Sequence, residues 1–154
     1  MSELIKLGCT VADVYHRYHD IHGALFGASY FRRMVDALRG RRQRTYDKSS
    51  LALKALQEEL EQLEPQIADP QQDRSTTGAD RELRKTLLEY TRAVRQSVIG
   101  LEHICTHLDQ DEAAYRALGP DGRSRFTADK LDYDHRLSEL ERLGTRLERL
   151  FSHY

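Results

Sequence analysis

Apolar residues return every three or four positions along most of this chain, and that spacing is typical of amphipathic helices. Between residues 49 and 67 the steps alternate between three and four, through Leu53, Leu56, Leu60 and Leu63. An α-helix has about 3.6 residues per turn, so such residues form one apolar stripe along its length. A stripe with this spacing indicates a helix that lies nearly parallel to a neighbouring helix.

Stripes of this kind predict four helices. The first is expected over about 3–21 and the third over about 81–109, while Thr127 is expected to cap the fourth. For the second, one helix over about 30–67 is preferred to two helices joined near residues 45–49. The chain is therefore predicted to be an all-α, antiparallel, up-down four-helix bundle with long, coiled-coil-like helices.

The segments between these helices carry the residues that favour turns. Residues 22–29 contain two glycines and are expected to form a turn, and residues 119–122 (Gly-Pro-Asp-Gly) are typical of a tight turn. Residues 65–80 are polar, hold two of the three prolines and are expected to form a mobile loop. A short helical piece is expected over 112–118. Residues 1–154 show no internal repeat, so a single domain is predicted.

Composition limits the classes of function. The net charge of −1 creates no general attraction to nucleic acid or to anionic lipid, so such binding would need a local patch. No stretch approaches the roughly 20 apolar residues of a membrane span. Cys9 and Cys105 stand far apart in apolar surroundings, which predicts two buried, reduced thiols. The expected location is the cytoplasm, and no membrane partner is expected.

The histidines suggest a metal site. Two histidines four positions apart on a helix can bind one ion, and His103 and His107 have this spacing. The pattern resembles that of hemerythrin-type iron bundles. A histidine-rich metal-binding or redox bundle is therefore one alternative, with a metal ion as its cofactor. Its candidate ligands are His16, His19, His22, His103, His107 and His135.

Most of these histidines do not point inward by helical spacing. At about 100° per residue, His103 and His107 turn away from the apolar stripe of their helix, and so does His16, whereas His22 lies on the stripe. Histidines on the rim of the bundle are therefore expected in preference to a metal site, and no cofactor is predicted. At a partner interface they would confer pH sensitivity.

A basic segment over 32–48 is a candidate binding surface. It holds seven basic and two acidic residues, with Tyr30 and Tyr46 beside its ends. It could hold nucleic-acid phosphates, lie exposed to solvent, or meet an acidic protein surface. An acidic segment over 58–64 follows it, so two copies could pair in opposite directions. The basic residues are Arg32, Arg33, Arg39, Arg41, Arg42, Arg44 and Lys48.

Arg17 and His22 suggest a second nucleic-acid alternative. Their spacing is similar to the arginine–histidine signature of HEPN-type ribonucleases, which are helical bundles. That resemblance implies a pair that positions a scissile phosphate. It rests on spacing alone.

Leu88 and Ile99 indicate a further apolar contact. Both lie well away from the main apolar stripe of their helix, so either another helix or another chain should cover them. Together with the stripes and the charged segments, they favour a non-enzymatic interaction protein, such as an adaptor, chaperone or complex subunit. Its expected partner is another protein, and a homodimer or other homo-oligomer is expected.

Overall fold

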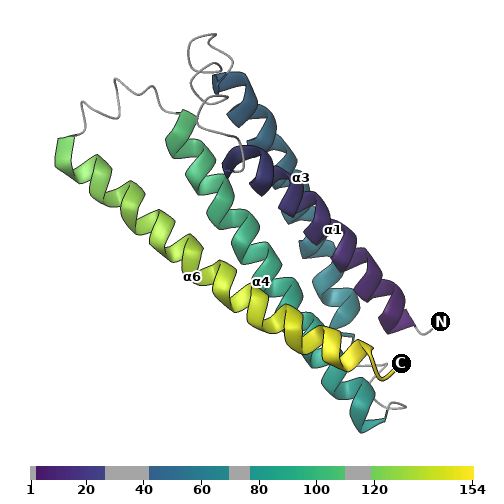
Figure 1. Cartoon of the computed structure of the whole chain (residues 1–154). Coiled ribbons are helices and arrows are strands. Elements are labelled where there is room, and N and C mark those ends of the chain that lie inside the picture. Colours follow the sequence, from purple (N-terminus) through teal and green to yellow (C-terminus); the bar gives the residue numbers. More distant parts are fainter. Residues whose placement is uncertain (1–2, 27–41, 70–76, 110–118) are drawn as a thin grey trace.

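The computed structural model describes residues 3–26, 42–69, 77–109 and 119–154, and within them the side chains of 3–25, 48–69, 77–105 and 131–154. Each helix runs antiparallel to the one before it (Figure 1). The all-α four-helix bundle expected from the sequence is therefore confirmed over this part of the chain. Its helices are α1 (Glu3–Phe26), α3 (Arg42–Ile67), α4 (Gly78–Asp109) and α6 (Gly119–Phe151).

Helix α4 lies at the centre of the bundle. Its backbone runs close to those of α3 and α6, while α1 rests mainly against α3 and also contacts α4. Its buried face includes Leu87, Val94 and Leu101, which have no exposed surface. The buried hydroxyls of Thr91 and Ser97 donate to backbone carbonyls one turn earlier, which satisfies them. A helix with three neighbours thus keeps polar residues inside without leaving these two groups unpaired.

Helix α1 is longer than the sequence predicted. The expected turn over 22–29 was wrong in its first part, because the helix continues through Gly23 to Phe26. Leu25 and His22 lie seven and four positions after Tyr18, so they continue the same buried side of the helix. A glycine inside a helix costs about 1 kcal/mol, and burial of Leu25, which is 8% exposed, offsets it.

Helix α3 is continuous from Arg42 to Ile67, so the alternative with a joint near 45–49 was wrong. The expected helical start near residue 30 lies outside the described residues. The helix also runs through Pro65, where a loop was expected. Proline weakens a helix interior, but Ile67 beyond it has no exposed surface, and its burial favours the last turn.

Helices α4 and α6 both begin earlier than predicted. Before α4, the Thr77 hydroxyl accepts from the Asp80 backbone N–H at 3.3 Å and donates to the Asp80 carboxylate at 2.9 Å, which caps the helix. Helix α6 begins at Gly119 rather than at Thr127, so the predicted turn over 119–122 was wrong. Pro120 lies in its first turn, where a missing N–H costs no hydrogen bond. The helical piece expected over 112–118 lies outside the described residues.

Cys105 is buried as expected, whereas Cys9 is exposed, so its expected burial was wrong.

No helix in the described part of the chain combines the length and the apolar character that crossing a membrane requires.

Candidate functional site

A chain of hydrogen bonds joins two tyrosines and a histidine inside the bundle. The hydroxyls of Tyr18 on α1 and Tyr133 on α6 lie 2.5 Å apart. The Tyr133 hydroxyl also lies 2.6 Å from Nδ1 of His22. Both tyrosine side chains are 2% exposed, whereas His22 is half-buried. This cluster, called the Tyr–His cluster below, links polar groups of α1 and α6 inside the bundle.

Local sequence explains how the three side chains meet. Tyr18 and His22 are four positions apart, so they lie on the same side of α1. On α4, Gly100 makes room for the Tyr133 ring, because a β-carbon there would lie 3.1 Å from ring atom Cδ2. A larger residue at position 100 would therefore displace the Tyr133 ring.

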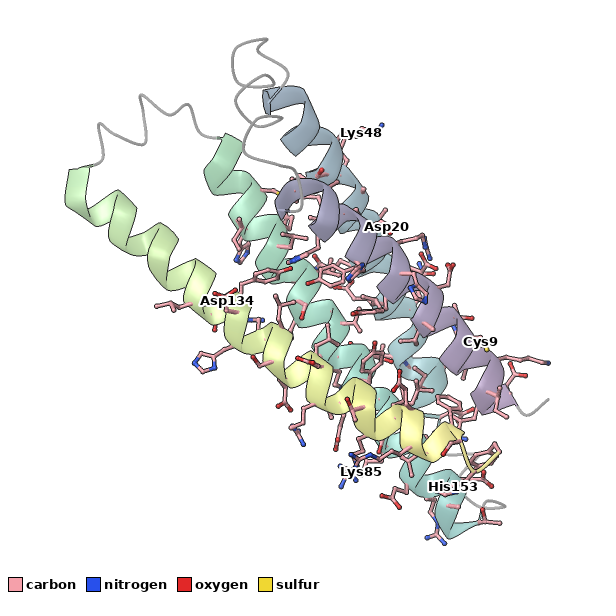
Figure 2. All side chains as sticks on the ribbon, viewed as in Figure 1. Cys9, Asp20, Lys48, Lys85, Asp134 and His153 are labelled. Atoms are coloured by element: carbon pink, nitrogen blue, oxygen red, sulfur yellow. The ribbon has the colours of Figure 1, made fainter. Side chains whose placement is uncertain are left out.

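Further aromatic rings extend the Tyr–His cluster along α1. The Tyr15 ring centre lies 6.1 Å from that of Tyr18 and 6.2 Å from that of Tyr90 on α4. The Tyr15 ring also contacts those of His16 and His19, at 5.9 Å and 6.0 Å. Such tilted ring pairs are favourable beyond their burial. Side chains from three helices fill this part of the bundle (Figure 2).

Burial controls the titration of the Tyr–His cluster. It raises the pKa of Tyr18 to about 12, although the hydrogen bond between Tyr18 and Tyr133 acts in the opposite direction. Burial, followed by the proximity of Tyr18, raises the pKa of Tyr133 far above its ordinary value. Burial and then the neighbouring His19 lower the pKa of His22, against a smaller raising effect of Asp134. All three side chains are therefore uncharged at neutral pH.

The structure does not bring the predicted metal ligands together. His16, His19, His103 and His135 are exposed on three different helices. Among the residues with described side chains, no three histidine, cysteine, aspartate or glutamate residues lie close enough to hold one ion. The side chain of His107 lies outside that set, so the alternative in which His103 and His107 bind one ion is not tested.

Arg17 and His22 have different neighbours. Arg17 donates to Glu59 of α3 at 2.7 Å, and its guanidinium lies 3.1 Å from Asp13. His22 instead meets Tyr133 of α6. The two side chains whose spacing resembles the HEPN signature therefore make contacts on opposite flanks of α1, and they do not converge on one place.

The acidic segment of α3 is engaged by arginines of the same chain. Glu59 pairs with Arg17, as described above. Glu64 lies 2.9 Å from the guanidinium of Arg95 and 3.5 Å from that of Arg92, both on α4. Because the Glu64 side chain is only 16% exposed, these pairs belong to the contact between α3 and α4.

The predicted interaction residues are only partly described. Arg32, Arg33, Arg39 and Arg41 lie outside the described residues, while Arg42 and Arg44 belong to the first turns of α3.

The two apolar residues predicted to meet another surface lie on α4. Leu88 is half-buried and packs against the core, so the bundle itself supplies its apolar neighbours. Ile99 is half-buried. By helical spacing, both share the flank of α4 whose Arg95 and Glu102 reach α3.

The sequence alone did not predict the Tyr–His cluster. The available signal was the four-residue spacing of Tyr18 and His22 on an apolar stripe. That spacing predicts a polar pair facing inward, but it does not identify the partner on α6.

The fold and this site together define an all-α bundle with a buried tyrosine–histidine centre. No protein-family model, no curated protein and no solved structure matched the chain.

Proposed function

We propose that this chain is a non-enzymatic interaction protein, an adaptor or complex subunit, that binds an acidic protein surface through the basic N-terminal end of α3. One observation supports this proposal above others: the two charged ends of α3 have different surroundings. The acidic end is paired with arginines of α1 and α4. The basic end extends past α1.

The position of the basic end follows from the register of α1 and α3. The two helices are antiparallel, and Arg17 pairs with Glu59. Counting outward from this pair places Phe26, the last described residue of α1, opposite about Ser50. Residues 42–48 therefore lie beyond the described end of α1, as Figure 1 shows for the first turns of α3. The described part of α1 therefore does not cover the first turns of α3.

Charge at this end favours an acidic partner. Arg42, Arg44 and Lys48 stand against Asp47 alone in these turns, and Lys48 is exposed (Figure 2). Long-range attraction between such a cluster and carboxylates accelerates association and orients the partner. A different protein with its own carboxylates fits better than a second copy, because the acidic segment of α3 already has arginine partners.

A charge-reversal variant tests the proposal. The full-length chain and its Arg42→Glu, Arg44→Glu, Lys48→Glu variant would be used as baits in nuclease-treated cell extract at about 0.1 M salt, where charges interact over about 10 Å. Mass spectrometry would quantify the retained proteins. We expect a retained protein with an Asp- and Glu-rich surface whose recovery falls at least about tenfold with the variant.

The matched control reverses three exposed basic residues near the start of α4 and the end of α6, at the opposite end of the bundle, namely Arg81, Lys85 and Arg149. Partner recovery should survive this change. Equal loss in both variants, or no loss in either, would overturn the proposal.

Two other outcomes would redirect the proposal. Retention from a parallel untreated extract that is absent from the nuclease-treated extract would favour nucleic acid, and that binding would weaken steeply with salt. A mass of two chains by light scattering, reduced to one chain in the charge-reversal variant, would favour a homodimer.

A further inference from the structure

An exposed leucine lies next to the basic end of α3. Leu51 is 69% exposed, the largest fraction among the large apolar side chains that the structure describes. It stands two positions before Leu53, which has no exposed surface, so helical spacing places Leu51 on the outward side of α3. Lys48 lies three positions earlier and is also exposed. An apolar and a basic side chain therefore share the surface near the point where the described part of α1 ends.

Small apolar residues continue this surface across α3 and α1. Ala55 is exposed one turn after Leu51, and Ala24 is exposed near the end of α1. The register of the two helices places Ala24 opposite about Ala52, which is half-buried. The three exposed residues, Ala24, Leu51 and Ala55, are called the Leu51 patch below. Single exposed apolar residues are ordinary on a protein surface, whereas a group of them bordered by charge is typical of an interaction site.

The spacing within the Leu51 patch suits a helical partner. Lys48, Leu51 and Ala55 follow one another at three and four positions, so they form one stripe along α3. Helices pack side by side through residues with this spacing, and a small side chain such as that of Ala55 permits a close approach. At Gly23, beside Ala24, a β-carbon would meet nothing within 4 Å, so the outward side of α1 is open there.

Basic residues border Leu51 on both sides along α3. Lys48 and Lys54 stand three positions before and three positions after it, and both are exposed. The Lys54 side chain remains 60% exposed although a carboxylate of α4 lies 3.7 Å from its Nζ. Glu58, seven positions after Leu51, is exposed and acidic. Carboxylates of a partner are therefore favoured around Leu51 and toward the basic end, and disfavoured farther along α3.

We propose that the Leu51 patch is the apolar part of a docking surface for one amphipathic helix of an acidic partner protein. The apolar stripe of that helix covers Leu51 and Ala55, and the carboxylates that border the stripe meet Lys48 and Lys54. Burial of Leu51 contributes affinity, while the charges orient the helix. This inference rests on the proposed function, because it specifies how the acidic surface is presented to the basic end of α3.

Two synthetic peptides of about 20 residues test the inference, since that length supports a helix in isolation. The first carries leucines at steps of three and four along one side, with glutamates on both borders. The second has the same composition, but its leucines are spread around the helix. Fluorescence anisotropy with the full-length chain would measure both affinities. We expect the first peptide to bind at least about fivefold more tightly, and to shift the amide NMR signals of residues 24 and 48–55.

A matched pair of variants locates the apolar contact. Leu51→Gln should weaken binding of the first peptide by about 5- to 20-fold, because the burial of one leucine side chain is lost. Leu131→Gln removes a leucine that is 60% exposed on α6, and it should bind this peptide as the wild-type protein does. The inference is overturned if the two peptides bind alike, if neither binds, or if the two variants have the same affinity.

Charge reversal separates this inference from the proposed function. Reversal of Arg42, Arg44 and Lys48 should weaken binding of both peptides. If it does so while Leu51→Gln has no effect, the proposed function stands and the Leu51 patch has no part in it. A charge reversal that leaves the affinity of the first peptide unchanged would overturn the proposed function and, with it, the acidic partner assigned to the Leu51 patch.

Discussion

The ring of Phe151 at the end of α6 lies directly against Gly8 of α1. A β-carbon at position 8 would come within 2.5 Å of ring atom Cζ, which is far closer than two carbon atoms can approach. This glycine therefore permits the close contact between α1 and α6 near the chain ends. At Gly23, in the same helix, a β-carbon would meet nothing within 4 Å.

These two glycines predict opposite effects of alanine. Gly23→Ala should raise the free energy of unfolding by about 0.5–1 kcal/mol, because alanine favours the helix. Gly8→Ala gains the same helical preference but must displace Phe151, so it should be about 1–3 kcal/mol less stable than Gly23→Ala. Urea unfolding of both variants measures the difference, and equal stability would show that the Phe151 contact is not tight.

The Glu64 pairs should matter more than an exposed pair. Glu64→Gln removes the largely buried carboxylate that Arg92 and Arg95 share, although Arg95 keeps Glu61 at 3.8 Å. We expect the free energy of unfolding to fall by about 1–2 kcal/mol, as measured by urea unfolding.

Glu139→Gln is the matched control for Glu64→Gln. Glu139 lies 2.6 Å from Arg142, but both side chains are more than half exposed, and this pair should contribute little. A similar decrease in the free energy of unfolding in the two variants would contradict the idea that the Glu64 pairs matter more because they are more buried.

Tyr154 ties the end of the chain to the start of α4. Its hydroxyl donates to the Asp80 carboxylate at 2.5 Å, and this bond, followed by that from Thr77, lowers the pKa of Asp80. Tyr154→Phe should therefore raise the pKa of Asp80 toward its ordinary value, as carbon NMR of the carboxyl group can measure. Because the pKa of Asp80 is lower in the folded state than in the unfolded state, the carboxylate stabilises the fold at pH values above its unfolded-state pKa. This stability is lost as the pH falls through the folded-state pKa. An unchanged titration of Asp80 in the variant would rule out the bond.

The buried tyrosines predict alkaline behaviour. Tyr18, with a pKa raised to about 12, and Tyr90 and Tyr133, whose pKa values are raised further, stay protonated in the folded state above pH 10. A tyrosine whose pKa is higher in the folded state stabilises the fold at pH values below its unfolded-state pKa of 10.0. This stability is lost as the pH rises through the folded-state pKa. Ultraviolet absorbance should show these three ionising only together with unfolding. Gradual ionisation of all eight tyrosines before unfolding would contradict their burial.

The sequence predicted the bundle well because the apolar stripes repeat over many turns. Leu53, Leu56, Leu60 and Leu63 occupy the core as their spacing indicated. Helix ends were predicted less well, because local turn signals compete with burial farther along the chain. Gly23 favours a helix end, but burial of Leu25 two positions later favours continuing the helix.

The Tyr–His cluster could not be predicted in full from the sequence. Spacing along α1 identifies Tyr18 and His22 as neighbours, but Tyr133 lies more than 100 positions later and meets them only through the packing of α6. The ion pair of Arg17 with Glu59 was missed for the same reason. Nothing in the local sequence states that a carboxylate 42 positions away becomes its partner.

The central place of α4 implies an uneven tolerance to substitution. Each position on its buried face touches residues from different parts of the chain, so one change there disturbs several contacts at once. The outward faces of α1 and α6 have water as their neighbour and can accept most polar residues. A deep mutational scan should therefore find its longest intolerant stretch in the third quarter of the chain, far from either terminus.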